Sequence, residues 1–274
     1  MTSNHLTELP SVDGWALVLG ASSGFGGAAA LAFARAGMHV VGVHLDRRAT
    51  QDNVERIVTS IKELGREAWF FNVNAADEER RREVLGTIQR RFLDRGRRER
   101  LRVLFHSLAF GSLRRFIAED VEEQASQKQL EMTIDVMANS LVYWSQEAVE
   151  RGLIGEGGRI LAMTSTGSTM CWRGYGAVSA AKAALESHIR QLAFELASRK
   201  ITANAICAGV TDTPALRKIP DNARMIDTAL RKSPSQRLTL PEDVAATLVA
   251  LVHPCTYWMT GNTIFVDGGE GHAG

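Results

Sequence analysis

The sequence contains few cysteines, and none is arranged as a disulfide or metal motif. Among 274 residues only Cys171, Cys207 and Cys255 are cysteines, an odd number with wide separations. No Cys-x-x-Cys pair or Cys/His cluster accompanies them. A disulfide framework and a zinc site are therefore not indicated, and we expect three buried thiols in the reducing cytosol and no bound metal.

The sequence also lacks a strong excess of positive or negative charge, and it lacks long apolar runs. The formal net charge is +1 at pH 7, whereas a nucleic-acid-binding protein usually shows a strong basic excess. The most basic stretch, residues 90–102, is interpreted as a solvated helix end and loop. No run of eighteen apolar residues occurs, and the polar tail at residues 1–13 lacks the pattern of a signal peptide. We expect neither nucleic acid nor a membrane among the partners.

The sequence does contain an alternation of short apolar runs with longer segments of helical period. The apolar runs are continuous, as in parallel strands that are covered on both faces. They predict strands at residues 15–21, 39–45, 67–73, 102–109, 158–165, 201–208 and 262–268, separated by helices at 26–37, 51–64, 77–93, 122–151, 177–199 and 242–252. The predicted fold class is α/β: a Rossmann-type, doubly wound parallel sheet of about seven strands with helices on both faces.

A glycine turn follows the first predicted strand. Gly20, Gly24 and Gly26 are spaced Gly-x3-Gly-x-Gly and lead into an alanine-rich helix. Glycines let the backbone turn sharply and approach a pyrophosphate, and the helix start supplies free N–H groups and a positive dipole end. Placed between a strand and an amphipathic helix, the turn predicts dinucleotide binding. Without an internal repeat or linker, residues 1–274 are expected to form a single dinucleotide-binding domain.

The glycine spacing resembles that of the short-chain dehydrogenase/reductase family. The resemblance covers residues 14–270 and includes "GNTIFVDGG" at 261–269, which looks like the last strand of that family. In this order and spacing along the chain, the motifs together are specific for that family. The resemblance implies an NAD(P)H-dependent oxidoreductase.

The end of the second strand bears on the choice between NADPH and NADH. An acidic side chain there binds the adenosine ribose 2′-hydroxyl and repels a 2′-phosphate. His44 stands at the acidic position of NADH-type relatives, and Asp46 follows two residues later. Arg47 and Arg48 come next, and either guanidinium is suited to a 2′-phosphate. NADPH is favoured, and Asp46 leaves NADH open.

The resemblance implies further cofactor contacts. Asn72 and Val73 look like the adenine-contacting Asp-Val pair of the family, with an amide in place of the carboxylate. Thr211 and Thr213 match the loop after the sixth strand, where a threonine contacts cofactor phosphate. The residues expected to bind the cofactor are Gly20, Ser22, Ser23, Gly24, Phe25, Gly26, Arg47, Arg48, Asn72, Val73, Ser107, Ala109, Lys182, Gly209, Thr211 and Thr213.

The stretch "GYGAVSAAK" at residues 174–182 carries the candidate catalytic pair. Residues four and seven apart share one face of a helix, so Tyr175 and Val178 both lie on the face of Lys182. Moving a tyrosine from position 178 to 175 shifts its root by roughly 5 Å along the helix axis. Such a shift requires the backbone to bend before the helix. Gly174 and Gly176 flank the tyrosine and permit this bend at little energetic cost.

A Tyr-x6-Lys pair in place of Tyr-x3-Lys is typical of the enoyl-acyl-carrier-protein reductases within the family. Residues 106–110, "HSLAF", resemble the His-Ser-Ile-Ala-Phe turn of those enzymes. Ala208 and Gly209 stand where ketone reductases usually have Pro-Gly. These features favour reduction of a C=C bond that is conjugated to a thioester.

Ser165 lies seventeen residues before Lys182, at the position of the serine that binds the substrate carbonyl in ketone reductases. One branch of the enoyl reductases, the NADPH-dependent kind that resembles the bacillar third isoform, keeps a serine there, and residues 211–221 also resemble that branch. The active-site asparagine of many family members is replaced by Met137. This departure argues against a proton relay through that helix.

The resemblance assigns Tyr175, Lys182 and Ser165 as the catalytic residues. Tyr175 is expected to donate to the enolate oxygen that forms from the thioester carbonyl, with Ser165 as a secondary contact. Lys182 is expected to bind the nicotinamide ribose and to bias Tyr175 electrostatically. His106 is interpreted as a structural turn residue rather than an acid or base. The polar segment 212–235 is expected to be a mobile lid over the acyl chain.

Other interpretations stay open. Tyr175 could pack as an ordinary aromatic, which would leave a nucleotide-binding homologue without catalysis. Alternatively, Tyr175 could serve a ketone or 3-oxoacyl reductase, or an enoyl reductase of secondary metabolism. The expected substrate is an acyl thioester, carried on an acyl carrier protein or another carrier. A homotetramer or homodimer, paired through helices near 122–150 and 177–199, is an expectation by resemblance.

Overall fold

A seven-stranded parallel sheet forms the centre of the protein, as the sequence predicts. The computed structural model describes residues 11–96 and 99–272, so residues 1–10 of the predicted polar tail lie outside the described part. The strand order is β3-β2-β1-β4-β5-β6-β7, and all the pairs are parallel. The strands are β1 (Trp15–Leu19), β2 (His39–His44), β3 (Ala68–Asn72), β4 (Leu101–His106), β5 (Ile154–Thr164), β6 (Thr202–Ala208) and β7 (Thr263–Val266).

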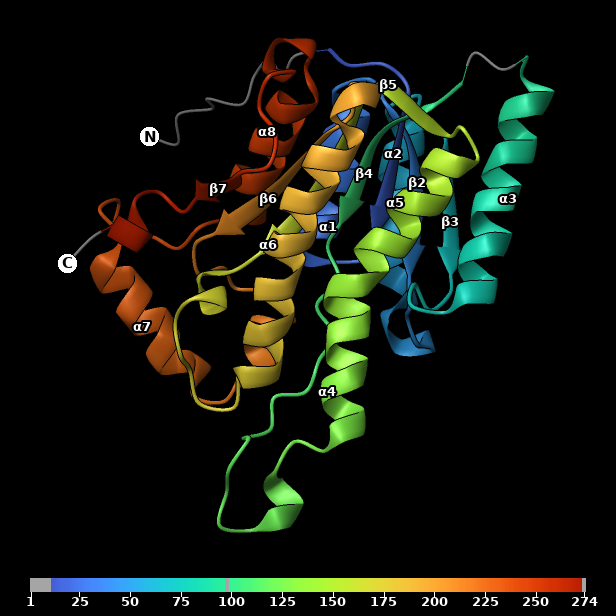
Figure 1. Ribbon diagram of the computed structural model, residues 1–274. Helices are drawn as coiled ribbons and strands as arrows, with labels where there is room; N and C mark the ends of the chain where they lie inside the picture. The colour runs from blue at the N-terminus through green and yellow to red at the C-terminus, as the bar shows by residue number, and fades with distance from the viewer. Residues whose placement is uncertain (1–10, 97–98, 273–274) are drawn as a thin grey trace.

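Helices cover both faces of the sheet, which confirms the doubly wound arrangement (Figure 1). One apolar core lies between the sheet and helices α1, α2 and α8, and a second lies beneath α3, α5 and α6. The helices are α1 (Gly24–Arg35), α2 (Gln51–Glu63), α3 (Glu78–Asp94), α4 (Gln127–Ile134), α5 (Ser140–Glu150), α6 (Gly176–Leu196), α7 (Asn222–Lys232) and α8 (Pro241–Val252). Within the described ranges, no helix has the length and apolar character needed to cross a membrane.

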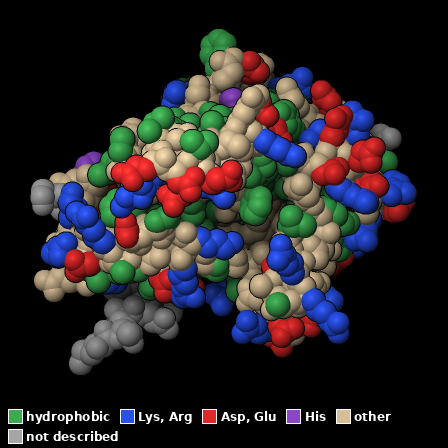
Figure 2. Space-filling model, turned by 90° about the horizontal axis from the view of Figure 1, so that it is seen from below, with side chains coloured by type: hydrophobic (Ala, Val, Ile, Leu, Met, Phe, Trp, Pro, Cys, Tyr) green, Lys and Arg blue, Asp and Glu red, His purple; other side chains and the backbone are tan. Residues whose placement is uncertain are grey.

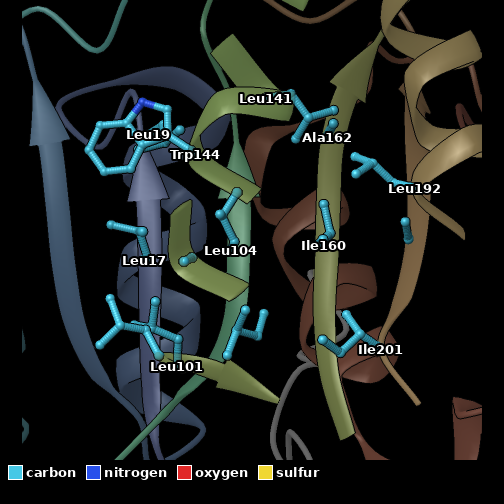
Figure 3. Packing of buried hydrophobic residues seen from close by; sticks show 14 of the residues in the cluster. Leu17, Leu19, Leu101, Leu104, Leu141, Trp144, Ile160, Ala162, Leu192 and Ile201 are labelled. Atoms are coloured by element: carbon cyan, nitrogen blue, oxygen red, sulfur yellow. The ribbon is translucent and has the colours of Figure 1, made fainter. Parts of the chain in front are cut away.

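The second core shows why the central strands read as continuous apolar runs. Leu17, Leu104 and Ile160 project from β1, β4 and β5 into the same layer (Figure 3). Trp144 of α5 belongs to the same cluster, and its indole N–H donates to the Ala75 carbonyl at 2.8 Å. Residues on the opposite face of the strands pack beneath α1 and α8, so both faces are removed from water.

The helix predicted at 122–151 is wrong at its start. Helix α4 begins at Gln127, because Ser126 and Gln129 form a capping box that fixes the first turn. A π-helical segment, Asp135–Asn139, then separates α4 from α5. The strand predicted at 102–109 ends at His106, and residues 107–126 form an arm that extends beyond the sheet (Figure 1).

The segment predicted as a lid, 212–235, is not all loop. It contains helix α7, whose Ala229 is buried against the rest of the protein. The polar composition that suggests a loop instead belongs to the solvated face of this helix. The proposed mobility of this segment stays a prediction.

Candidate active site

The candidate functional residues gather at the carboxyl ends of the parallel strands, where α/β sheets commonly bind ligands. Figure 2 looks onto this edge and shows a recess near the middle of the face, with Lys and Arg side chains around it. The arm at 107–126, the loop after β5 and the segment after β6 surround this edge. The Trp172 indole N–H donates to the Pro220 carbonyl at 3.0 Å and joins the second of these segments to the third.

The glycine turn after β1 has the shape that a dinucleotide requires. Gly20 has φ +89°, and a Cβ on Gly26 would lie 2.0 Å from the Gly20 carbonyl oxygen. The turn is therefore closed to larger residues, and the first helical N–H groups of α1 point out of it without a side-chain cap on Ser23. These features fit the pyrophosphate of NAD(P)H.

Predicted cofactor residues from other strands lie against this turn. The Ser107 N–H donates to the Leu19 carbonyl at 2.9 Å, and its own carbonyl oxygen lies close to Gly20. A Cβ on Gly24 would contact Thr213 at 3.5 Å. The structure thus brings the ends of β1, β4 and β6 together, as the sequence predicts.

The remaining predicted residues of this half differ in exposure. Thr211 is buried, and its hydroxyl donates to the Gly209 carbonyl at 3.0 Å. Ala109 lies exposed on the arm. Val73 donates its N–H to the His44 carbonyl at 2.8 Å and so continues the pairing of β3 with β2. Contacts of these residues to a cofactor stay predictions.

Asp46 is the acidic group at the end of β2. Its carboxylate lies 3.0 Å from Nδ1 of the buried His44. Partial burial acts to raise the pKa of Asp46, but hydrogen bonds from Thr50, Ser22 and His44 outweigh it and lower the pKa. Asp46 is therefore an ionised carboxylate that already accepts hydrogen bonds, one of them from Ser22 of the glycine turn.

Two guanidinium groups stand next to this carboxylate. Arg47 and Arg48 are exposed, and neither forms an ion pair within the described residues. Asn72, predicted to contact adenine, uses its amide otherwise: Oδ1 accepts from the Asp46 N–H and Nδ2 donates to the Asp46 carbonyl, both at 3.0 Å. Asn72 therefore shapes the turn that presents the arginines, and its adenine contact stays a prediction.

Lys182 is buried at the other end of the site. Its Nζ donates to the Met163 carbonyl at 2.8 Å. Burial disfavours the charged form and lowers the pKa of Lys182 from 10.5 to about 8, against the opposing effect of the Glu186 carboxylate. Glu186 is held in turn by the Thr164 hydroxyl at 2.6 Å. Lys182 is therefore not the solvated helix lysine that the sequence leaves as an alternative.

Tyr175 lies directly before α6, beside Ser165. A Cβ on Gly167 would lie 2.4 Å from the Tyr175 ring, so the ring packs against this glycine where no larger residue fits. Burial raises the pKa of Tyr175, and a hydrogen bond with Ser165 opposes the shift. Ser165 Oγ also accepts from the Gly167 N–H at 3.1 Å. The structure therefore brings Tyr175 together with Ser165, which follows the end of β5 and is two residues after the Met163 carbonyl that holds Lys182.

The usual tyrosine position is closed by packing. Val178 is buried in an apolar cluster with Val136, Met137 and Ala181. A Cβ on Gly111 of the arm would lie 3.0 Å from Met137 Sδ and 3.2 Å from Val178 Cγ2. Position 178 thus faces the arm and the π-helical segment, and the cluster has no room for a phenol ring.

Sequence reasoning missed three residues that shape this site. Gly167 makes room for the Tyr175 ring, Glu186 balances the charge of Lys182, and Ser140 receives the imidazole of His106 at 2.8 Å. Glu186 lies one helical turn after Lys182, so its placement could have been found from helical spacing. The other two depend on contacts between segments far apart in the chain.

Across residues 11–96 and 99–272, no group of three or more His, Cys, Asp or Glu side chains is placed to hold a metal ion.

Comparisons with known proteins agree with this geometry. Residues 20–270 match a family model described as enoyl-(acyl carrier protein) reductase. The NADH-dependent enoyl-[acyl-carrier-protein] reductase of a Nostoc species is 29% identical and aligns over 85% of this chain and 87% of its own. A 3-oxoacyl-[acyl-carrier-protein] reductase of a Synechocystis species is 31% identical over 93% and 95%.

A solved structure has the same fold. The short-chain dehydrogenase of Burkholderia cenocepacia in complex with NADP is 26% identical, with a TM-score of 0.80 over 96% of this chain and 100% of its own. Relatives with enoyl and with ketone substrates in their names thus match at similar identity. The chain belongs to the enoyl-(acyl carrier protein) reductase family within the short-chain dehydrogenases/reductases, and it is an NAD(P)H-dependent oxidoreductase.

Proposed function

We propose that the protein reduces the C=C bond of a 2-enoyl thioester with NADPH. The observation that carries this proposal is the placement of the phenol: Tyr175 lies beside Ser165 directly after β5, whereas position 178 is a valine packed into an apolar cluster. The acid therefore stands two helical turns before Lys182 rather than one. Tyr175 also packs against that cluster, and its place beside Ser165 is what favours an enzyme over the catalytically silent alternative.

The residues of the chain would act on the thioester carbonyl. The cofactor, when bound, supplies a hydride to the β-carbon of the substrate, and the carbonyl oxygen then becomes an enolate oxygen. The Tyr175 hydroxyl donates to that oxygen, where negative charge exists mainly in the transition state. Its raised pKa keeps the hydroxyl protonated as the donor at neutral pH.

Lys182 would bind and orient rather than transfer a proton to substrate. Its ammonium has three donors, and the Met163 carbonyl takes one of them. Another is suited to a nicotinamide ribose hydroxyl. A cation at this place also favours charge on the phenol and the enolate oxygen in a site largely removed from water. Ser165 is a second donor for the carbonyl.

NADPH is proposed because of the two arginines after β2. Arg47 and Arg48 are exposed and lack partners within the described residues, so their guanidinium groups are free to hold a 2′-phosphate. Asp46, which would repel that phosphate, already accepts hydrogen bonds from Thr50, Ser22 and His44. NADH use would follow if Asp46 binds the ribose instead.

The substrate carrier, the oligomeric state and the cellular compartment are proposed as well. An acyl thioester, on an acyl carrier protein or on coenzyme A, suits the mixture of apolar and basic groups on the arm and the segment after β6. The edge strand β7 exposes Phe265, and Phe194 and Trp258 are exposed near it, which supports a homo-oligomer. The expectation of three buried thiols is wrong for Cys171 and Cys255, which lie on exposed segments, and only Cys207 is buried. Exposed free thiols suit a reducing, cytoplasmic compartment.

Oxidation of NADPH and of NADH with crotonyl-CoA and with a longer 2-enoyl thioester tests this proposal. Tyr175→Phe is expected to lower kcat by about 10²-fold or more, since it removes a donor to the oxyanion. Tyr257→Phe, which changes an exposed tyrosine, is the matched control and should retain full activity. Full activity in Tyr175→Phe would contradict the assignment of Tyr175.

A 3-oxoacyl thioester reductase is the second candidate, favoured by one observation. Ser165 stands beside Tyr175, and a serine–tyrosine pair is equally suited to polarise a ketone. Faster turnover of a 3-oxoacyl thioester than of the matching 2-enoyl thioester would select this candidate. The same Tyr175→Phe variant would lose activity in either case.

A further inference from the structure

One buried ionisable side chain next to the site has no part in the proposed mechanism. His106 is the last residue of β4 and is fully removed from solvent. One ring nitrogen, Nε2, lies 2.8 Å from Ser140 Oγ at the start of α5. The other, Nδ1, is buried without a hydrogen-bond partner within the described residues. Buried polar atoms usually have a partner, so the bare Nδ1 requires an explanation.

The Ser140 contact decides which nitrogen carries the proton. The Ser140 hydroxyl donates its single hydrogen to the Val136 carbonyl at 2.7 Å. Ser140 Oγ can then only accept from His106, so Nε2 carries the hydrogen. Nδ1 is left as an unprotonated acceptor with a free lone pair.

Sheet register places this acceptor on the same side as Lys182. His106 pairs with Ala162 of β5, and the next residue, Met163, supplies the carbonyl that holds the Lys182 ammonium. His106 reaches Ser140 of α5 above the sheet, on the face that α6 also covers. Burial, followed by the charge of Lys182, lowers the pKa of His106 to about 3, so the ring is neutral at every working pH.

We propose that His106 is a positioning residue for Lys182: its Nδ1 accepts a hydrogen bond from one buried water, to which the Lys182 ammonium donates. The ammonium of α6, held at the Met163 carbonyl of β5, has donors to spare, and the acceptor at the end of the neighbouring strand β4 has no donor. Pairing them satisfies both and holds the ammonium where it can serve Tyr175 and the cofactor ribose. The inference rests on the proposed role of Lys182 but not on the identity of the substrate.

The proposal predicts the direction of a pH effect. Removing the acceptor takes away stabilisation of the protonated lysine, so the pKa of Lys182 should fall below its value of about 8. The Glu186 carboxylate on α6 raises the pKa of the same lysine and stays in place in the variants. Tyr175 ahead of α6 and Cys207 on β6 are the other titratable groups around it, and they stay in place as well. Asp135 of the π-helical segment is hydrogen-bonded to the Tyr143 hydroxyl.

Two substitutions separate the two ring nitrogens. His106→Asn places an amide oxygen near the position of Nδ1 but loses the donor to Ser140. His106→Gln keeps a donor within reach of Ser140 but has no acceptor at Nδ1. We expect His106→Gln to move the alkaline limb of the kcat–pH profile down by about one pH unit, the worth of a hydrogen bond to a charged group. His106→Asn should leave the limb near the wild-type position, with KM little changed in both.

The profiles are recorded with whichever thioester the wild type turns over, so a failure of the enoyl assignment leaves this test intact. Equal shifts in both variants would indicate a merely structural role of the imidazole and would overturn the proposal. An unshifted limb in His106→Gln would overturn it as well.

A spectroscopic measurement needs neither substrate nor folded His106 variants. Long-range ¹H–¹⁵N spectra of the apoprotein with ¹⁵N-labelled histidine report which ring nitrogen is protonated. We expect a ring protonated at Nε2 and bare at Nδ1, whose Nδ1 signal moves in Lys182→Met and not in Lys62→Met. A protonated Nδ1, or an Nδ1 signal that Lys182→Met does not move, would overturn the proposal.

Discussion

The two ends of the candidate site differ in how far they are removed from water. At the ends of β4 and β5, His106 and Lys182 are buried, and each has a strongly lowered pKa. At the end of β2, Arg47 and Arg48 are exposed, and Asp46 is only partly covered. The buried end is where the proposed reaction takes place, and the exposed end is where the 2′-phosphate of the cofactor is proposed to bind.

This difference teaches where single charges have large effects. Buried groups interact through a medium of low polarisability, so one hydrogen bond or one charge changes a pKa by whole units. Exposed groups are screened by water and salt, and each contributes little. Substitutions at the buried end should therefore change the reaction, whereas those at the exposed end should only adjust cofactor preference.

Lys182→Met should give the largest effect. The substitution keeps an unbranched side chain of similar size but removes the ammonium that biases Tyr175. We expect kcat to fall by about 10²- to 10⁴-fold, measured as NAD(P)H oxidation with a 2-enoyl thioester. A variant that retains a third of the wild-type kcat would show that the buried cation does not assist the reaction.

Lys182→Met should also change how stability depends on pH. Between about 8 and 10.5 the folded wild type holds fewer protons than the unfolded chain, because the pKa of Lys182 is lowered on folding. Lys182 should therefore contribute a rise of roughly 3 kcal/mol to the free energy of unfolding across this window. The buried Cys207 thiol, whose pKa is raised to about 12, acts in the opposite direction above pH 9, so the contribution of the lysine is measured as a difference between variants. Urea unfolding at several pH values should show a steeper rise, or a smaller fall, in the wild type and in Lys62→Met than in Lys182→Met.

Val178→Tyr is expected to have the next largest effect. It restores the tyrosine spacing of ketone reductases, but position 178 is packed against Met137 and Gly111. The variant should lose about 1–3 kcal/mol of unfolding free energy and should not rescue Tyr175→Phe. Ala180→Tyr, on the exposed side of α6, is the matched control and should stay within about 0.5 kcal/mol of the wild type. Recovery of activity in the double variant would show that a phenol at 178 reaches the site.

The smallest effect is expected at the end of β2. Asp46→Asn keeps the shape and one acceptor oxygen but removes the charge, and should raise the preference for NADPH over NADH by about fivefold. Arg47→Ala should lower that preference by a similar factor, and both effects should shrink in high salt. Arg90→Ala, an exposed arginine on α3, controls for net charge. A change above a hundredfold would mean that this end is more deeply buried in the complex than in the free protein.

Much of the fold could be predicted from local pattern. The continuous apolar runs around Leu17, Leu104 and Ile160 indicate strands covered on both faces, and the structure confirms all seven. Element ends were harder, because they depend on side-chain caps such as the Ser126–Gln129 box. Helix α7 was missed because its polar composition resembles that of a loop, and only packing of residues such as Ala229 distinguishes the two.

The sequence by itself determined the chemistry available at the site. Helical spacing places Tyr175 and Lys182 on one face of α6, and the glycine turn predicts a dinucleotide, because both depend on backbone geometry over a few residues. Tertiary structure alone decided how these groups behave. The Met163 carbonyl and the bare Nδ1 of His106 come from strands outside the helix of Lys182, and Gly167 comes from the turn before it. Burial among such neighbours sets pKa values and hydrogen bonds, and no local pattern records it.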